Sequence, residues 1–368
     1  ADTTQKRRNR RDDFAAILFA FQEELASVTI LDPACGSGNF LYVALAALMD
    51  LEKELIAYGA SNGLPMMLPR VTPSQLHGLE INEYAREIAQ VVIWIGYIQW
   101  MTVNGFQVRR DPVLEALETI RLQDALLDRQ EDGSVHETVW PTVDFIIGNP
   151  PFLGGNKIRQ ELGDPYLDDL FKVYEGRVPR FADLVCYFFE KARTESASGR
   201  VKRIGLLATN SIRGGANRRV LERIKQTGDI FMAWDDEPWI LDGAAVRISI
   251  IGFDAGQDQD RYLDGVPVVT INADLTATVD LTVARVLSEN IGISFMGDKK
   301  HGPFDIQAEI ALQWLSLPLN PNGRPNNDVV RPWVNGLDVT RRPRNMWIID
   351  FGVHMPEEQA ALYEAPFE

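Results

Sequence analysis

Residues 28–55 read VTILDPACGSGNFLYVALAALMDLEKEL and join a short apolar run to a longer one through a glycine-rich turn. The first run has the length of a buried strand, and residues 40–55 have the length and apolar spacing of a helix. Gly36 and Gly38 allow the backbone to approach a ligand closely. The turn lacks the third glycine of a dinucleotide-binding fingerprint and the lysine of a phosphate-binding loop. The stretch therefore predicts a strand, a ligand-binding turn and a helix.

The same alternation continues along the chain. We predict further strands at residues 75–80, 119–127, 143–148, 203–209, 229–234 and 246–253, and further helices at residues 12–25, 83–101, 180–192 and 216–224. Seven strands alternating with helices predict an α/β fold with a mostly parallel sheet and helices on both faces. The last two strands have no helix between them, which predicts an antiparallel hairpin at the edge of the sheet.

The composition changes beyond the seventh strand. Residues 254–282 have the pattern of a hairpin, and from about Ile291 the chain is rich in Pro, Asn and Trp. We predict an N-terminal helical segment at residues 1–27, the main domain at residues 28–290 and part of a second, α+β domain at residues 291–368. The charged opening and the ending YEAPFE lead us to expect a fragment of a longer protein.

Bulk properties exclude several classes of protein. The net charge of −15 argues against a generally basic nucleic-acid-binding surface, although it allows a local basic cleft. The basic clusters at residues 5–11 and 341–344 are interpreted as solvated faces. Two cysteines, Cys35 and Cys186, and four histidines form neither a disulfide framework nor a metal-ligand spacing. We expect no metal site, and a cytoplasmic protein, because there is no signal peptide and no apolar run of membrane-spanning length.

An acidic residue follows each of the first three predicted strands: Asp32, Glu80 and Asp124. At the carboxyl ends of parallel strands these side chains share one edge of the sheet, where open α/β sheets bind ligands. An acid beside the glycine turn suits an ammonium group, the second suits the hydroxyls of a ribose, and the third suits the amino group of an adenine. This set predicts a pocket for S-adenosylmethionine; the alternative is that the acids are ordinary helix caps.

The fourth strand runs into Asn149-Pro150-Pro151-Phe152. Two prolines end sheet pairing and stiffen the turn. The Asn149 side-chain oxygen and the Pro150 carbonyl can accept hydrogen bonds from an exocyclic amine, which localises the nitrogen lone pair for attack on a methyl donor. Phe152 can stack on a base, which is worth about 1–3 kcal/mol. The motif therefore predicts methylation of an amino group on a flat ring; the alternative is a strand-to-loop turn with a packed phenylalanine.

The motifs DPACGSGNF, LHGLE, RLQD and GNPPF, in this order, resemble the amino-methylating DNA methyltransferases of the adenine-N6, gamma type. The stretch DDEPWILDGAAVRISIIGF at residues 235–253 and the segment at residues 320–352 resemble, more narrowly, the type IIL, MmeI-like restriction–modification proteins. The resemblance covers nearly all of the chain. It implies a class I S-adenosylmethionine-dependent methyltransferase with a Rossmann-like fold, acting on an adenine flipped out of double-stranded DNA in the bacterial cytoplasm.

The resemblance also implies two sets of site residues. Those at the S-adenosylmethionine site are Asp32, Ala34, Gly36, Gly38, Asn39, Phe40, Glu80, Ile81 and Asp124. Those at the target adenine are Asn149, Pro150, Pro151 and Phe152. Asp183, in RFADL, matches the motif on the helix after the catalytic strand.

Two departures from the family pattern affect the expected activity. The upstream segment that covers the cofactor and the nuclease, with its Glu-x-Lys motif, are both missing, so we expect weak methylation and no DNA cleavage by this chain. The nuclease and the rest of the target-recognition domain are expected elsewhere in the parent protein. Alternatives are a cytosine-N4 DNA methyltransferase, a protein-glutamine N-methyltransferase, which shares the Asn-Pro-Pro-aromatic turn, and a non-catalytic DNA-binding module.

Overall fold

The computed structural model describes residues 2–106, 116–241, 244–277, 304–334, 343–352 and 354–367, together with Gly302 and Asp338. The chain divides into two compact units, residues 1–284 and 285–368. The predicted boundary between residues 290 and 291 lies outside the described residues and stays a prediction.

A nine-stranded sheet forms the centre of the first unit, in the order β11-β10-β8-β9-β7-β6-β1-β2-β3. Strands β1, β2, β3, β6 and β7 are mutually parallel, whereas β9 runs antiparallel to both β7 and β8. The strands are β1 Ile30–Asp32, β2 Leu76–Glu80, β3 Ile120–Leu122, β6 Phe145–Gly148, β7 Arg203–Thr209, β8 Asp229–Leu241, β9 Ala244–Asp254, β10 Arg261–Leu263 and β11 Val266–Val268. The mostly parallel α/β sheet is therefore confirmed.

The predicted number of strands, seven, was wrong. Strands β10 and β11 add a short hairpin beyond β8, so the β8–β9 pair does not form the edge of the sheet. The turn of the added hairpin is Asp264-Gly265, and both residues have positive φ, 52° and 76°, as a tight two-residue turn requires. Sequence reading recognised hairpin composition here but did not join it to the main sheet, because the pairing of Tyr262 with Met232 is a long-range contact.

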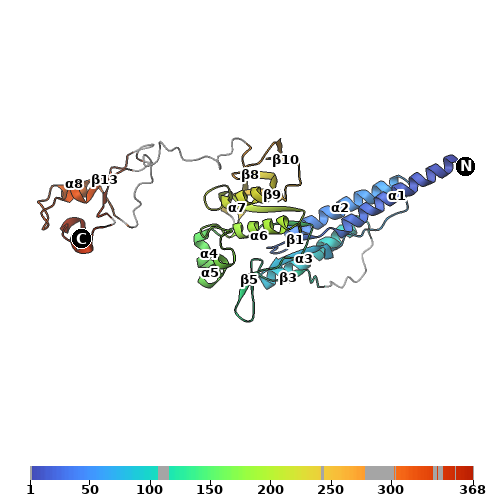
Figure 1. Cartoon of the computed structure of the whole chain (residues 1–368), viewed down its shortest axis with the longest axis horizontal. Helices are drawn as coiled ribbons and strands as arrows, with labels where there is room; N and C mark the ends of the chain where they lie inside the picture. Colours follow the sequence, from blue (N-terminus) through green and yellow to red (C-terminus); the bar gives the residue numbers. More distant parts are fainter. Residues whose placement is uncertain are drawn as a thin grey trace. The chain divides into compact units, whose positions relative to one another are not determined.

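Helices cover both faces of this sheet (Figure 1). They are α1 Asp2–Ser27, α2 Asn39–Ser61, α3 Glu83–Val103, α4 Gly155–Leu162, α5 Asp164–Val173, α6 Val185–Ala197 and α7 Arg218–Thr227, with the 3₁₀ turns η1 Pro73–Gln75 and η2 Asn210–Arg213. Successive strand residues supply two different cores, since side chains alternate across a sheet. Ile30 packs in the core with α1, α2 and α3, whereas Leu31 packs in the core with α5, α6 and α7.

Helices α4 and α5 were not predicted from the sequence. Gly154, Gly155 and Gly163, with Pro165, gave this stretch the composition of a loop. In the structure Pro165 occupies the first turn of α5, where its missing N–H is not needed. A separate hairpin, β4 Leu127–Arg129 and β5 Val135–Glu137, precedes β6. Helices α4 and α5 matter because Leu162 and Tyr166 lie with Glu80 and Asp124 at the carboxyl ends of the parallel strands.

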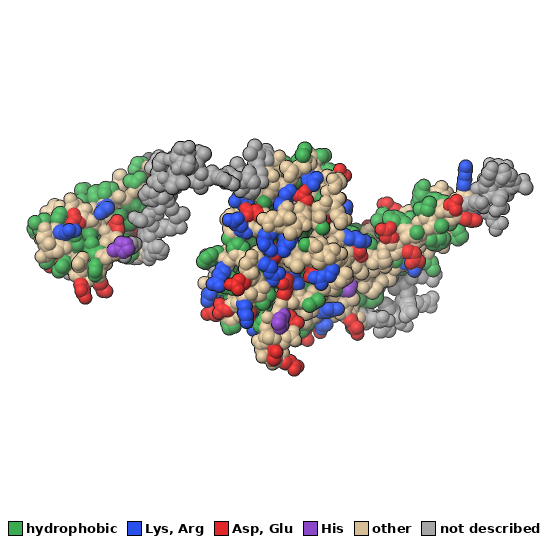
Figure 2. Space-filling view, viewed as in Figure 1, with side chains coloured by type: hydrophobic (Ala, Val, Ile, Leu, Met, Phe, Trp, Pro, Cys, Tyr) green, Lys and Arg blue, Asp and Glu red, His purple; other side chains and the backbone are tan. Residues whose placement is uncertain are grey.

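Many basic side chains of the first unit are neutralised locally. In Figure 2, Lys and Arg side chains gather with acidic ones over α6 and α7. Arg193 and Arg223 both pair with the fully buried carboxylate of Glu190, at 2.8 and 2.9 Å. These pairs lower the pKa of Glu190 against the effect of burial. The positive charges of these two arginines are therefore compensated within the unit.

The second unit has its own small α+β core. Strands β12 Asp305–Ile306, β14 Met346–Ile349 and β13 Val330–Trp333 form an antiparallel sheet in that order. Helices α8 Ala308–Leu315, α10 Glu357–Ala360 and α11 Glu364–Phe367 and the turn η5 Asn326–Asp328 accompany it. Of the basic cluster at residues 341–344, Arg341 and Arg342 lie outside the described residues, and Arg344 pairs with Asp338 at 2.8 Å.

Candidate active site

The glycine-rich turn between β1 and α2 is bound to the neighbouring strand β2. The Cys35 amide donates to the Leu79 carbonyl at 3.1 Å, and the Gly36 amide donates to Glu80 Oε2 at 2.9 Å. Gly38 caps α2 with a φ of 82°, and a Cβ there would lie 3.1 Å from Ala89. Glycine is therefore required at position 38 both by the backbone conformation and by the contact with α3.

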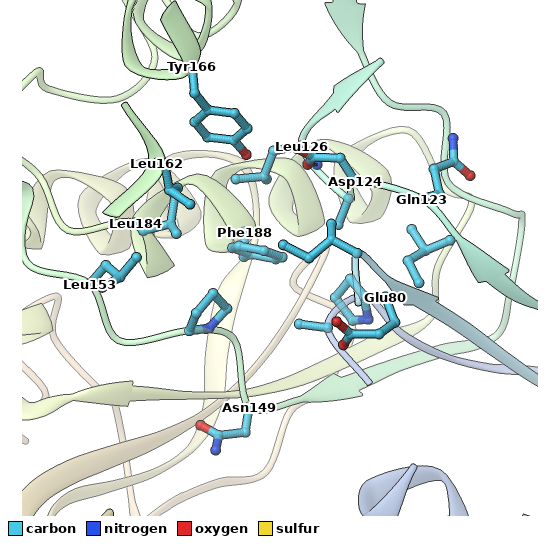
Figure 3. A pocket seen from close by; sticks show the side chains of 16 residues that line it. Glu80, Gln123, Asp124, Leu126, Asn149, Leu153, Leu162, Tyr166, Leu184 and Phe188 are labelled. Atoms are coloured by element: carbon cyan, nitrogen blue, oxygen red, sulfur yellow. Dashed lines mark hydrogen bonds between the residues drawn. The ribbon is translucent and has the colours of Figure 1, made fainter. Parts of the chain in front are cut away.

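A pocket of about 340 Å³ lies at the carboxyl ends of β1, β2, β3 and β6. Glu80 and Asp124 lie on one side of it, and Asn149 lies on the segment that follows β6 (Figure 3). Predicted site residues that line this pocket are Ala34, Glu80, Ile81, Asp124, Asn149 and Pro151. Residues from four segments far apart in the sequence thus meet in one cavity.

Backbone amides orient both pocket carboxylates. Glu80 Oε1 accepts from the Asn82 amide at 2.9 Å, in addition to the bond from Gly36. Asp124 Oδ1 accepts from the amides of Leu126 and Leu127 at 2.8 and 3.2 Å. Each carboxylate oxygen has two acceptor sites, so these bonds leave capacity for hydroxyl or amino donors of a ligand.

The other wall of the pocket is apolar and was missed by sequence analysis. It is built by Leu153, Leu162, Tyr166, Leu184 and Phe188, from the turn after Phe152, the inserted helices α4 and α5, and the start of α6. Tyr166 directs its hydroxyl toward Asp124 (Figure 3), and burial, together with this carboxylate, raises the pKa of Tyr166. No short motif marks these side chains, because only the packing of the insertion brings them to the pocket.

Asp32 lies behind the pocket rather than in it. Its carboxylate is 1% exposed, and Oδ1 accepts from the Ala34 amide at 3.0 Å. A Cβ at Gly148 would stand 2.6 Å from the same oxygen, so glycine at position 148 leaves room for Asp32. Burial, with a smaller contribution from Glu80, raises the pKa of Asp32 to about 7. Its predicted contact with a ligand ammonium stays a prediction, and the role visible here is to hold the turn.

Because the pKa of Asp32 is raised in the folded protein, we expect Asp32 to make the free energy of unfolding depend on pH. Between pH 3.8 and about 7 the unfolded chain loses this proton while the folded chain keeps it, so the free energy of unfolding falls as pH rises through this window. Asp32→Asn removes the dependence and keeps an oxygen for Ala34. We expect the variant to gain about 3 kcal/mol relative to wild type between pH 4.5 and pH 8, at 1.36 kcal/mol per pKa unit. Urea unfolding at both pH values measures this, with the exposed Asp168→Asn as control.

The Asn149-Pro150-Pro151-Phe152 turn contains an unpaired polar atom. Asn149 Oδ1 is buried and accepts no hydrogen bond from the described residues. An unsatisfied buried acceptor costs free energy, which marks this oxygen as the place for an external donor. Phe152 lies on a second cavity, of about 610 Å³, together with Lys157 and Phe181. Phe181 is 82% exposed, an unusual position for a large apolar side chain that sequence analysis did not single out.

The remaining predicted residues surround the turn without lining the first pocket. Asn39 and Phe40 open α2, the former exposed and the latter half-buried, and Pro150 is buried within the turn that follows β6. Ile81, which does line the first pocket, directly follows β2 and is 66% exposed. No group of metal-ligating side chains occurs among the residues that the structure describes. In the same residues, no helix has both the length and the apolarity to cross a bilayer.

The strand order β3-β2-β1-β6-β7-β9-β8, with β9 antiparallel and the acidic pocket at the carboxyl ends, is that of the class I methyltransferase fold. The family described as "MmeI, DNA-methyltransferase domain" matches residues 3–264. The chain therefore belongs to this family, and the resemblance found in the sequence is confirmed.

Individual relatives agree with this assignment. The fold is similar to a solved structure of the type IIL restriction–modification enzyme MmeI in complex with DNA, with a TM-score of 0.69 and 23% identity over 98% of this chain and 50% of that one. DNA methyltransferase A of Bacillus subtilis (strain 168) is 29% identical over 240 residues, which cover 62% of this chain and 26% of that protein. A putative type II restriction enzyme and methyltransferase of Methanocaldococcus jannaschii is 34% identical over 93 residues, 25% of this chain and 8% of that protein. The chain thus spans about a quarter or less of these two proteins and half of the solved structure.

Proposed function

We propose that this chain transfers a methyl group from S-adenosylmethionine to the N6 amino group of an adenine flipped out of double-stranded DNA. The observation that carries the proposal is the buried Asn149 Oδ1, which follows β6 and has no hydrogen-bond partner in the described part of the chain, beside a pocket that also contains Glu80 and Asp124. An acceptor without a donor suits an amine substrate. The family membership supports DNA as the molecule that carries this amine.

The pocket fits S-adenosylmethionine by its chemistry. Among the described residues, its lining contains two carboxylates and many apolar side chains but no Lys or Arg, which disfavours ligands with phosphate groups. A volume of about 340 Å³ lies within the usual range for small-molecule sites. In this proposal Glu80 accepts from the ribose hydroxyls, Asp124 accepts from the adenine amino group, and the leucines with Phe188 cover the purine ring. When bound, S-adenosylmethionine supplies an electrophilic methyl group.

The turn Asn149-Pro150-Pro151-Phe152, called the catalytic turn from here on, acts on the amine. Asn149 Oδ1 and the Pro150 carbonyl accept hydrogen bonds from the two N–H groups of the amine. These bonds draw the nitrogen toward a tetrahedral geometry with a localised lone pair. The prolines hold both acceptors in place before the substrate arrives, so little reorganisation is needed during the reaction. Phe152 stacks on the base and offsets part of the few kcal/mol needed to flip it from the duplex. No covalent enzyme intermediate is required.

We propose further that the chain is the methyltransferase part of a restriction–modification protein, with residues 291–368 beginning its target-recognition domain. The whole protein then methylates DNA at a specific site, and the remaining recognition region reads the bases.

Product analysis tests the reaction. The protein is incubated with S-adenosylmethionine labelled in the methyl group and with unmethylated bacterial DNA, which is then digested to nucleosides and separated by mass. We expect label in N6-methyladenine. Label in N4-methylcytosine would support the cytosine alternative, and label transferred to added protein instead of DNA would support the glutamine alternative. Either outcome contradicts the proposal.

A further inference from the structure

One side chain outside the pocket holds the far end of the catalytic turn. Asp183 precedes α6, and its Oδ1 accepts from the Gly155 amide at 3.1 Å. Its Oδ2 accepts from Ser211 Oγ at 2.8 Å and from Asn217 Nδ2 at 2.7 Å. In return, Asn217 Oδ1 accepts from the Asp183 amide at 2.8 Å. A single carboxylate thus links the segment after β6 to the turn after β7 and to the start of α7.

The backbone around Asp183 reinforces this link. The Leu184 amide donates to the Leu153 carbonyl at 2.8 Å. A Cβ at Gly155 would stand 2.7 Å from the Phe181 carbonyl oxygen, so the two segments approach as closely as backbone allows. Residues 149–155 are therefore held at one end by strand β6 and at the other by residues 181–184.

The chemistry of the contacts requires a carboxylate at position 183. Three donors converge on its two oxygens: a backbone amide, a hydroxyl and a side-chain amide. An ionised carboxylate only accepts hydrogen bonds, whereas an asparagine presents a donor on one side. In Asp183→Asn at least one of the three donors faces another donor and loses its hydrogen bond. The segment after β6 is then held less firmly.

We propose that Asp183 is a positioning residue that sets the geometry of Asn149-Pro150-Pro151-Phe152 for methyl transfer. The inference rests on the function proposed above. Asp183 lies on the second cavity, with Phe152, and not on the pocket that contains Glu80 and Asp124, so its effect reaches the reaction through the turn and not through binding of the methyl donor. A misplacement of about 1 Å in reacting groups can cost on the order of 10²-fold in rate.

The first test compares Asp183→Asn with a matched control in the same strand–loop unit. We expect kcat to fall by about 10²-fold, while the dissociation constant of S-adenosylmethionine changes less than about twofold. The control is Asp144→Asn. Asp144 accepts from the amide and the hydroxyl of Thr29 at 2.9 and 3.1 Å and pairs with Lys202 at 2.8 Å, but it lies before β6, at the opposite end from Asn149. Asp144→Asn leaves kcat unchanged.

An exchange of the two partners provides the rescue. In Asp183→Asn combined with Asn217→Asp, the new side-chain amide at position 183 donates to the new carboxylate at position 217, which also accepts from the backbone amide of residue 183. The side-chain oxygen at position 183 still serves Gly155, and Ser211, whose Oγ lies 3.1 Å from Nδ2 of residue 217, donates to the new carboxylate. We expect the double variant to recover most of the lost kcat.

Hydrogen exchange separates this inference from the proposed reaction, because it needs no turnover. In Asp183→Asn the amides of residues 152–157 exchange about tenfold faster, as expected for a lost hydrogen bond; in Asp144→Asn and in the double variant they do not. Wild-type protein that binds S-adenosylmethionine but methylates neither DNA nor protein would overturn the proposed function. Unchanged exchange in Asp183→Asn, or an unchanged kcat, would overturn the role of Asp183.

Discussion

Asn149→Ala lowers the rate of methyl transfer to adenine by about 10²–10³-fold and leaves the binding of S-adenosylmethionine nearly unchanged. This magnitude is that of removing one preorganised hydrogen-bonding group from a transition state. Asn149 Oδ1 is buried and unpaired, so its removal breaks no bond among the described residues. Under the function proposed above, the lost interaction is the one with the substrate amine. Single-turnover measurement of labelled methyl transfer to DNA gives the rate, and calorimetry gives the affinity for the methyl donor.

An asparagine away from the pocket serves as the control for this substitution. Asn104 follows α3 at the opposite end from Glu83, and its Nδ2 donates to the Trp100 carbonyl at 2.8 Å. Asn104→Ala lowers the free energy of unfolding slightly and leaves the rate of methyl transfer unchanged. Equal rates in Asn149→Ala and wild type would exclude Asn149 as an acceptor for the target amine.

Glu80→Ala weakens the binding of S-adenosylmethionine by about 100-fold. Two hydrogen bonds from ribose hydroxyls to a charged group, at about 1.5 kcal/mol each, give about 3 kcal/mol, and 1.4 kcal/mol corresponds to a factor of ten. Glu80 faces the pocket, and its orientation is set by the amides of Gly36 and Asn82. Calorimetric titration of the protein with S-adenosylmethionine measures the change.

The Glu80 carboxylate also supports the glycine turn. A change in the ligand therefore separates its contact with the ribose from its effect on the turn. An analogue of S-adenosylmethionine without the two ribose hydroxyls binds wild-type protein about 100-fold more weakly than the parent compound, by the same arithmetic. Glu80→Ala binds the two compounds with similar affinity, because the partner of the hydroxyls is gone. If the variant still prefers the ribose compound by the wild-type factor, Glu80 acts only on the turn and the ribose is held elsewhere.

Local pattern predicted most of the parallel half of the sheet. Strand β7 has the predicted bounds, and β2 begins one residue later than predicted. The strand, turn and helix at residues 28–55 appear as β1, the glycine turn and α2. These segments depend on short-range properties, since an apolar run of five to seven residues next to an amphipathic helix has few alternatives. The acids at strand ends share an edge of the sheet for the same reason, because parallel strands carry their carboxyl ends to one side.

Other features required contacts between distant segments. The insertion of β9 between β7 and β8 depends on pairing across the whole of β9, and the addition of β10 to β8 depends on two residue pairs. The apolar wall formed by Leu162 and Tyr166 exists only after α4 and α5 fold against the sheet. Local composition, with its glycines and a proline, gives no helix signal there, and tertiary packing stabilises two short helices.

The sequence by itself determined the class of the fold, the order of the motifs and the residue types available for chemistry, because these follow from periodicity and side-chain identity. Tertiary structure alone decided which of those residues are buried, which line the pocket and which are hydrogen-bonded. It enclosed Asp32 while leaving Glu80 and Asp124 in the pocket, left Asn149 Oδ1 without a partner among the described residues, and brought Asp183 to the catalytic turn. Burial and the pairing of donors with acceptors depend on the three-dimensional neighbours of a side chain, which a linear pattern does not specify.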